Sequence, residues 1–279
     1  MSHIKKLVKM KLDKKVIIVT GASKGLGVAI ARQCSREGAS VVLAARSKDK
    51  LALLKEEITR SGGNALDICC DVSKIEDLKN LVASTIKAFG RIDGLVNNAG
   101  VNFVKPFLET QESEWDHIMN VDLKGSFFLS QFCAAQMVSQ NPKGGSIVQI
   151  ASVHTLASLP GAGPYDAAKR AMIGYSKAAA IELAKENVRL NVLSPGLCAT
   201  EIWNDILDAA PSEEECRRFW NSNIPTERLI EPEEIANVCV FLLSDMSSCV
   251  TGINLLADCG MTSQLISKEP YAAKQIGGK

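Results

Sequence analysis

Short apolar runs rich in β-branched residues recur along the chain and predict buried strands. The runs cover residues 15–20, 40–45, 64–70, 92–96, 144–150, 188–193 and 251–257. Segments with apolar residues at helical spacing lie between these runs and predict helices over residues 28–37, 48–61, 73–89, 112–138, 164–185 and 231–243. Because strands and helices alternate without a hairpin signal, we expect an α/β fold. Its doubly wound, parallel sheet should have about seven strands, with helices on both faces.

The same pattern indicates a single domain over residues 1–279, with a core over residues 12–260. Residues 197–225 interrupt the alternation with an irregular, partly helical segment that carries bulky apolar side chains, and we expect this segment to act as a lid. A polar tail over residues 261–279 follows the last strand. Its composition is compatible both with a contact to a neighbouring subunit and with a disordered end.

Composition and charge narrow the class of protein. The 279-residue chain has 46% hydrophobic residues and a formal net charge of +1, which is typical of a globular protein and gives no sign of a nucleic-acid partner. Its nine cysteines form neither a close CxxC pair nor a cluster with histidine. We therefore expect no metal site, and interpret the cysteines as buried thiols of a cytoplasmic protein. The basic N-terminus lacks the apolar core of a signal peptide, and no apolar run is long enough to span a membrane.

A glycine-rich loop directly joins the first predicted strand to the first predicted helix. Glycines let the backbone approach a ligand closely, and the N-terminus of a helix attracts phosphate. Many strand–helix turns contain glycines, but this placement is typical of dinucleotide binding. The candidate cofactor-binding residues in the loop are Gly21, Ser23, Lys24, Gly25, Leu26 and Gly27.

The end of the second predicted strand bears on the choice of cofactor. A site selective for NAD(H) usually has a carboxylate there for the ribose 2′-hydroxyl, whereas this chain has Arg46 and Ser47. A guanidinium suits a 2′-phosphate, and Lys24 adds a second positive charge, so we expect NADP(H) rather than NAD(H). The alternative is that both cations are ordinary surface charges. The third strand ends at Asp71 and Val72, which are placed to meet the adenine.

Tyr165 and Lys169 lie four residues apart in a segment with a helical pattern. This spacing puts both side chains on one helix face, one turn apart. An ammonium beside a phenol favours the phenolate, so this tyrosine is suited to exchange a proton with an alcohol or carbonyl oxygen. Ser152, at the end of the fifth strand, offers a hydroxyl to the same oxygen. Each residue alone is also compatible with a purely structural role, since such Tyr–Lys pairs occur by chance and a serine at a strand end is often a cap.

Together these motifs resemble those of the short-chain dehydrogenase/reductase family over roughly residues 12–260. Residues 20–27 are similar to the family's cofactor loop, and Ser152, Tyr165 and Lys169 to its catalytic serine, tyrosine and lysine. The resemblance implies a Rossmann fold in which Tyr165 is the general acid/base, Lys169 also holds the nicotinamide ribose, and Ser152 positions the substrate oxygen. It further implies hydride transfer at the nicotinamide C4 and a homotetramer or homodimer. Two more motifs, at residues 97–100 and 194–200, add the implied cofactor-binding residues Asn98, Ala99, Gly100, Pro195, Gly196 and Thr200.

One position departs from the family pattern. Asp122 lies where the family has a catalytic asparagine, which normally supports a water-linked proton path to the lysine. We expect Asp122 to pair with Lys169, to stabilise its ammonium and to weaken its effect on Tyr165. Asn120 is a poor substitute, because two residues on a helix differ in direction by about 200°.

The substrate is less well indicated. The pocket wall should come from residues 101–107, 153–159 and 197–225, with Val153, His154, Leu197 and Trp203 as candidate substrate contacts. His154 also fits an exposed loop residue, and Trp203 fits lid packing. We expect an NADP(H)-dependent oxidoreductase for a secondary alcohol or ketone: a hydroxysteroid, another cyclic alcohol, a sugar or polyol, or a 3-oxoacyl compound. The alternative is a non-catalytic NADP(H)-binding sensor or assembly protein.

Overall fold

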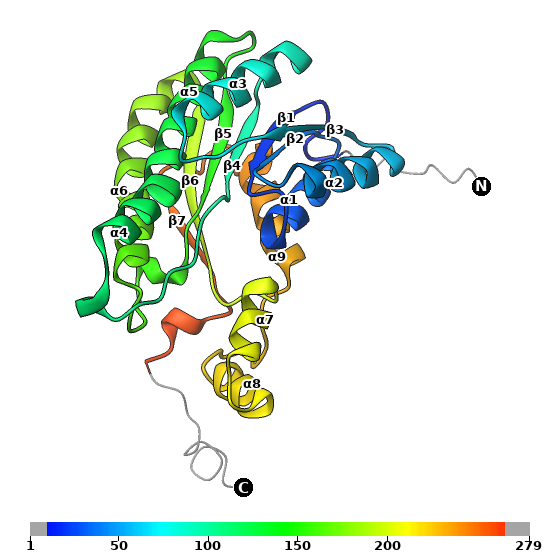
Figure 1. Ribbon diagram of the computed structural model, residues 1–279. Helices are drawn as coiled ribbons and strands as arrows, with labels where there is room; N and C mark the ends of the chain where they lie inside the picture. The colour runs from blue at the N-terminus through cyan, green and yellow to red at the C-terminus, as the bar shows by residue number, and fades with distance from the viewer. Residues whose placement is uncertain (1–9, 266–279) are drawn as a thin grey trace, which may run out of the picture.

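The computed structural model describes residues 10–265, which fold around one parallel sheet (Figure 1). The strands are β1 Val16–Thr20, β2 Ser40–Ala45, β3 Asn64–Cys69, β4 Gly94–Asn97, β5 Gly145–Ile150, β6 Val188–Pro195 and β7 Asn254–Ala257. Their order across the sheet is β3-β2-β1-β4-β5-β6-β7, and every neighbouring pair is parallel. The predicted doubly wound, seven-stranded sheet is confirmed.

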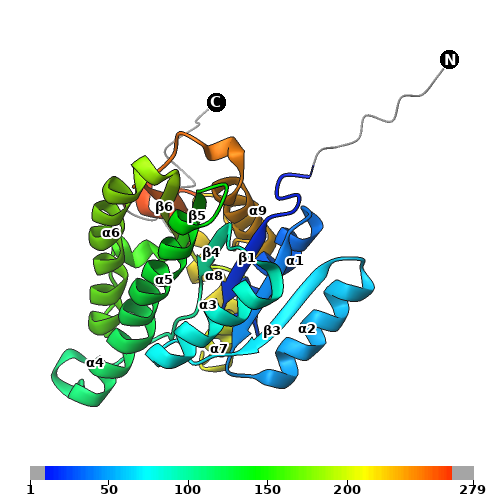
Figure 2. The same ribbon diagram turned by 90° about the horizontal axis from the view of Figure 1, so that it is seen from above.

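Helices cover both faces of this sheet (Figure 2). On one face lie α1 Gly25–Arg36, α2 Lys48–Arg60 and α9 Pro232–Leu243. On the other lie α3 Ile75–Phe89, α5 Gly125–Ser139 and α6 Gly163–Leu183, with the short α4 Glu112–Ile118 beside the end of α6. Short 3-10 helices are η1 Phe107–Glu109, η3 Val153–Thr155, η4 Ala184–Glu186, η5 Asp245–Ser247 and η6 Met261–Ser263.

The central strands are apolar throughout because both of their sides are buried. In β1, Ile17 and Val19 belong to the core that packs under α1 and α9, while Val16 and Ile18 belong to the core under α3 and α5. All four side chains are at most 4% exposed. Burial on both faces explains why the sequence shows continuous apolar runs here instead of alternation between apolar and polar residues.

The chain reverses its direction of travel across the sheet between β1 and β4, which are neighbours although two strands separate them in the sequence. In doubly wound sheets ligands bind outside the carboxyl ends of the strands at this switch point. Two helices of the predicted lid, α7 Glu201–Asp208 and α8 Glu213–Ser222, follow β6 and project beyond that edge (Figure 1). The fold therefore opens a site between the sheet edge and the lid.

Two predicted helices differ in detail from those observed. The expected continuous helix over residues 112–138 is divided by a π-helix, η2 Met119–Lys124, which separates α4 from α5. A π-turn holds one more residue than an α-turn and often marks a functional site, but it leaves no distinct period in the sequence. Helix α3 begins at Ile75, two residues later than expected, with Lys74 as its N-cap. The Ser73 hydroxyl donates a hydrogen bond to Asp71, at 2.7 Å.

The described part of the chain has no helix that is both long and apolar enough to cross a membrane. The tail predicted over residues 261–279 is described only as far as residue 265, so the expected subunit contact concerns mainly residues outside the described part.

Candidate active site

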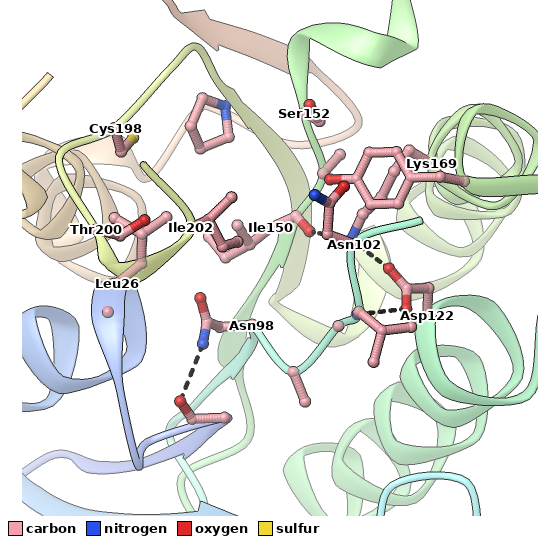
Figure 3. Close-up of a pocket in the computed structure, with 18 of the residues that line it drawn as sticks. Leu26, Asn98, Asn102, Asp122, Ile150, Ser152, Lys169, Cys198, Thr200 and Ile202 are labelled. Atoms are coloured by element: carbon pink, nitrogen blue, oxygen red, sulfur yellow. Dashed lines mark hydrogen bonds and ion pairs between the residues drawn. The ribbon is translucent and has the colours of Figure 1, made fainter. Parts of the chain in front are cut away.

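A cavity of about 710 Å³ lies at the carboxyl edge of the sheet (Figure 3). We call one part of this cavity the reaction end. It is lined by all four predicted catalytic residues and by three of the predicted substrate contacts, namely Asp122, Ser152, Tyr165, Lys169, Val153, His154 and Leu197. The remainder is lined by the predicted cofactor residues Gly21, Ser23, Lys24, Gly25, Leu26, Arg46, Ser47, Asp71, Val72, Asn98, Ala99, Gly100, Pro195, Gly196 and Thr200. Segments far apart in the sequence thus meet in one space.

Tyr165 and Lys169 lie one turn apart near the start of α6, which has Pro164 in its first turn, a position where proline is favourable. The Lys169 ammonium is 5.4 Å from the centroid of the Tyr165 ring. It also donates a hydrogen bond to the carbonyl oxygen of Ile150, at 3.2 Å, at the end of β5. Ser152 follows two residues later, so the strand that anchors Lys169 also delivers the serine hydroxyl to the cavity.

Asp122 forms a buried ion pair with Lys169, with 3.0 Å between Oδ2 and Nζ (Figure 3). Its side chain is fully buried, and that of Lys169 is only 5% exposed. The other carboxylate oxygen accepts a hydrogen bond from the backbone N–H of Val101, at 2.9 Å. A Cβ on Gly100 would lie 2.9 Å from Oδ2 of Asp122, so the turn after β4 needs a glycine at this point. The pairing expected from the sequence is present.

This ion pair determines the charge of the lysine. Burial is the largest single influence and lowers the pKa of Lys169, but the Asp122 carboxylate and the two tyrosines Tyr165 and Tyr175 together outweigh burial, and the pKa is raised above its ordinary value. Lys169 is therefore an ammonium at neutral pH. Part of its positive charge is offset by Asp122, which limits how strongly it can stabilise a phenolate at Tyr165.

The glycine loop forms a cradle that fits a dinucleotide phosphate. Gly21 and Gly25 have positive φ angles of 66° and 52°, which favour glycine. A Cβ on Gly27 would overlap the carbonyl oxygen of Gly21, so Gly27 permits close packing of α1 on the turn and does not itself line the cavity. Lys24, the N-cap of α1, makes no side-chain capping bond, so the first-turn N–H groups remain available to an anion.

The turn after β4 is fastened to the end of β1 through Thr20. The Thr20 hydroxyl accepts hydrogen bonds from the backbone N–H groups of Asn98 and Ala99, both at 3.0 Å. The amide group of Asn98 in turn donates to the carbonyl oxygen of Thr20, at 2.9 Å. These bonds fix the floor of the cavity between the glycine loop and the Lys169–Asp122 pair.

Three cations line the far end of the cavity. Arg46 and Lys24 were predicted from the sequence, and Lys50, in the first turn of α2, joins them. Lys50 was missed, because Arg46 precedes α2 and the spacing of the two residues does not by itself place them on one helix face. Asp71 lies nearby; burial tends to raise its pKa, but hydrogen bonds from Ser73 overcome this and the pKa is lowered.

The prediction that Trp203 contacts substrate is wrong. Its side chain is 3% exposed, does not line the cavity, and packs with the guanidinium of Arg217 5.6 Å from its ring. Two apolar faces run along α7, and the face with Trp203 and Leu207 is buried. The adjacent face, with Ile202 and Ile206, lines the cavity, together with Trp220 of α8.

One further residue was missed. Asp166 bonds to His154 next to the cavity, but its position gave no signal, because the two residues are brought together by the loop between β5 and α6. Within residues 10–265 there is no group of three or more His, Cys, Asp or Glu side chains that could hold a metal ion.

Comparison with known proteins identifies the family. The family model described as enoyl-(acyl carrier protein) reductase matches residues 21–262. The chain is 36% identical over 256 residues to an L-rhamnose 1-dehydrogenase (NAD(P)(+)) of Azotobacter vinelandii, covering 90% of this chain and 98% of the relative. It is 36% identical over 252 residues to a 3-oxoacyl-[acyl-carrier-protein] reductase of Thermotoga maritima, covering 90% and 99%.

A solved structure supports the same relationship. A short-chain type dehydrogenase/reductase from Mycobacterium marinum matches with a TM-score of 0.85 at 32% identity, covering 92% of this chain and 98% of that one. The similarity therefore extends over both the sheet and the elements that surround the cavity. The chain is an oxidoreductase of the short-chain dehydrogenase/reductase family.

Proposed function

We propose that this protein is an NADP(H)-dependent alcohol dehydrogenase or carbonyl reductase that interconverts a secondary alcohol and a ketone. The observation that carries the proposal is the cluster at the reaction end of the cavity. There, a lysine held as an ammonium lies one helical turn from a tyrosine and shares the cavity with a serine hydroxyl, the groups being Lys169, Tyr165 and Ser152.

The side chains divide the proton chemistry among them. In the reducing direction the Tyr165 hydroxyl donates its proton to the carbonyl oxygen, and in the oxidising direction the phenolate accepts the alcohol proton. The Ser152 hydroxyl donates a hydrogen bond to the same oxygen and holds it in place. The Lys169 ammonium stabilises the phenolate. When bound, the nicotinamide supplies or takes up the hydride, and Asn98, Gly100 and Thr200 are proposed to be among the residues that hold it.

The cofactor proposal is NADP(H), and it rests on three cations at the far end of the cavity and on Arg46, rather than a carboxylate, as the residue that follows β2. Arg46, Lys24 and Lys50 line this end of the cavity and are suited to a 2′-phosphate. Fluorescence titration of the purified protein with NADPH and NADH tests the preference. Tighter binding of NADPH supports it, and tighter binding of NADH contradicts it.

A single substitution sharpens this test. In Arg46→Ser we expect NADPH affinity to fall by about 10- to 100-fold, because charge-assisted hydrogen bonds to the phosphate are lost, while NADH affinity changes by less than about threefold. Lys48→Ser is the matched control, since Lys48 is an exposed cation of the same turn that does not line the cavity. If Arg46→Ser lowers the affinities for NADPH and NADH equally, Arg46 does not distinguish the 2′-phosphate.

The replacement of the family's asparagine by Asp122 has a kinetic consequence. In Asp122→Asn the Lys169 ammonium is no longer offset by a carboxylate, so the phenolate of Tyr165 is better stabilised. We expect the pH midpoint of alcohol oxidation to fall, because the carboxylate that offsets the ammonium is lost. The measurement is kcat/KM against pH.

A control separates this effect from a general change of charge. Asp116→Asn removes an exposed carboxylate from α4, and its pH profile should match that of the parent protein. A midpoint that stays in place or rises in Asp122→Asn would contradict the role given to this carboxylate.

The substrate is proposed to be an uncharged or weakly charged secondary alcohol or ketone. Support comes from the apolar wall of the reaction end, where Val101, Phe103, Ile202, Ile206 and Trp220 line the cavity. The first assays should cover hydroxysteroids, other cyclic alcohols, sugars or polyols, and 3-oxoacyl compounds. Turnover of none of them with either cofactor would favour the alternative, an NADP(H)-binding sensor or assembly protein.

We further propose a single-domain subunit that forms a homotetramer or homodimer in the cytoplasm. The free state of all the cysteines in the described residues is consistent with a reducing compartment. Light scattering of the purified protein tests the assembly, and a monomer would contradict it.

A further inference from the structure

A partly buried histidine–aspartate pair lies beside the proposed catalytic tyrosine. His154 belongs to η3, two residues after Ser152, and Asp166 follows Tyr165 in α6. The distance from Nδ1 of His154 to Oδ1 of Asp166 is 2.5 Å. The two side chains are only 16% and 12% exposed. This contact is separate from the Lys169–Asp122 pair, and the proposed proton transfer does not use it.

The pair fixes the histidine ring in one orientation. An ionised carboxylate only accepts hydrogen bonds, so Nδ1 of His154 carries the proton, and Nε2 is the free ring nitrogen. The ring packs edge-on against that of Tyr165, with 5.3 Å between centroids and an interplanar angle of 82°. No residue in the described range 10–265 forms a hydrogen bond with Nε2, and this atom is not among the buried nitrogens without a partner.

The backbone of His154 is fixed as well. Its N–H donates a hydrogen bond to the Ser152 hydroxyl, at 3.3 Å, and its carbonyl oxygen accepts one from Nε of Arg170, at 3.0 Å. The guanidinium of Arg170 also bonds the carbonyl oxygen of Ala157 and the hydroxyl of Ser158. The loop that carries His154 is therefore tied to α6, the helix that carries Tyr165, and the imidazole is held in place before any ligand binds.

The surroundings indicate what this imidazole can meet. His154 lines the reaction end of the cavity, where much of the wall is apolar. The two charged groups there, Asp122 and Lys169, are paired with each other. Glu201 lies next to Gly25 of the glycine loop. His154 thus brings a polar side chain with an unbonded Nε2 to the lining of this end, and the ion pair does not engage it.

We propose that His154, held by Asp166, forms a polar subsite for a second oxygen of the substrate, a hydroxyl on the carbon next to the reacting carbon. The inference rests on the proposed function and narrows its substrate class to hydroxyketones and the corresponding diols. Ser152 and Tyr165 engage the reacting oxygen. Because His154 is two residues from Ser152 and in ring contact with Tyr165, a substituent on the adjacent carbon falls next to it.

The chemistry of the free nitrogen selects a hydroxyl. Neutral imidazole accepts a hydrogen bond at Nε2, and imidazolium donates one from the same atom. A hydroxyl group can be partner to both forms, whereas a keto or ether oxygen can be partner only to the charged form. Sites built around a hydrogen bond to a substrate hydroxyl discriminate strongly against the analogue that lacks it, because the protein group is left unpaired.

The test measures binding and needs no turnover. Calorimetry of the protein–NADP⁺ complex would compare two matched ligand pairs, 2-hydroxycyclohexanone against cyclohexanone and 3-hydroxybutan-2-one against butan-2-one. We expect the parent protein to favour each hydroxylated ligand by at least about tenfold. In His154→Phe, which keeps a ring against Tyr165, affinity for the hydroxylated ligands should fall by about 10- to 100-fold while the other ligands change by less than about threefold.

Two more variants complete the design. Asp166→Asn should lose part of the preference, because the amide no longer fixes the proton on Nδ1. His117→Phe, a change at an exposed histidine of α4, should keep all of it. Equal losses for both members of a ligand pair in His154→Phe would show that the histidine only supports the loop and would overturn the inference. A parent protein that binds both members equally, or neither, would also overturn it.

The inference and the proposed function can fail separately. If the protein prefers hydroxylated ligands but turns over no carbonyl compound, the subsite is supported and the proposed reaction is contradicted. If the protein reduces ketones equally well with and without a neighbouring hydroxyl, the proposed reaction is supported and the subsite is contradicted. Parallel measurement of kcat/KM for the same ligand pairs distinguishes these outcomes.

Discussion

Tyr165→Phe is expected to lower kcat for carbonyl reduction by about 10²- to 10⁴-fold, the usual contribution of a positioned acid or base. The variant keeps the ring next to Lys169 and the edge contact with His154 and removes only the hydroxyl. NADPH affinity should therefore stay within about threefold of the parent value. Steady-state kinetics and fluorescence titration on the same preparation measure the two quantities.

Tyr175 provides the matched control on the same helix. Its hydroxyl forms a hydrogen bond with Ser126, at 3.1 Å, and burial raises its pKa to about 12, so it remains a neutral phenol under ordinary conditions. It does not line the cavity. Tyr175→Phe should keep kcat within about threefold and lower the free energy of unfolding by about 1 kcal/mol. Full activity in Tyr165→Phe would exclude this tyrosine as the acid or base.

Gly27→Ala should produce the second large effect, a loss of NADPH affinity of at least about 100-fold. The added Cβ would overlap the carbonyl oxygen of Gly21 and lie 2.7 Å from the side-chain nitrogen of Asn98. Backbone cannot yield as a flexible side chain does, so α1 has to move away from the turn that forms the phosphate cradle. Overpacking of this kind also costs about 1–3 kcal/mol of stability. Titration with NADPH and thermal unfolding measure the two effects.

Gly174→Ala is the control for this substitution. Gly174 lies within α6, and a Cβ there meets no atom of the described chain within 4 Å. Alanine in a helix interior is more favourable than glycine, so the free energy of unfolding should rise by about 0.5–1 kcal/mol with NADPH affinity unchanged. Normal cofactor binding in Gly27→Ala would show that the close packing of α1 is dispensable.

The sheet was predictable because its strands are buried on both sides. Continuous apolar runs such as Val16–Thr20 have no helical period and are bounded by turn residues. The glycine loop and the shared helix face of Tyr165 and Lys169 could also be predicted from the sequence, because local sequence determines both the helix and the direction in which its side chains point. All these features depend on residues close together in the chain.

Features that depend on tertiary contacts were not predictable in the same way. The division of the 112–138 helix at Met119–Lys124 coincides with Gly125 packing close to the backbone of Val72, a contact between distant segments. The lid helix α7 has two apolar faces, and the sequence does not show that Ile202 faces the cavity while Trp203 packs against Arg217 of α8.

Of two polar pairs at the site, one was predicted from the sequence and the other was not. The contact of Asp122 with Lys169 could be expected because the family resemblance aligned both residues with known positions. No such guide existed for Asp166, whose contact with His154 depends on the path of a loop. The sequence therefore identified the proposed reaction chemistry better than it identified the surroundings of the substrate.

The most direct test of the proposed reaction is transfer of deuterium from C4-deuterated NADPH, with each C4 epimer used in turn, to a panel of ketones under mass spectrometry. The panel should include 2-hydroxycyclohexanone, cyclohexanone, a 3-oxosteroid and a 3-oxoacyl thioester. We predict that the parent protein places one deuterium on the carbinol carbon of at least one product, from one epimer, and that Tyr165→Phe does so at least about 100-fold more slowly. Tight NADPH binding without label in any product would contradict the proposal and favour a sensor.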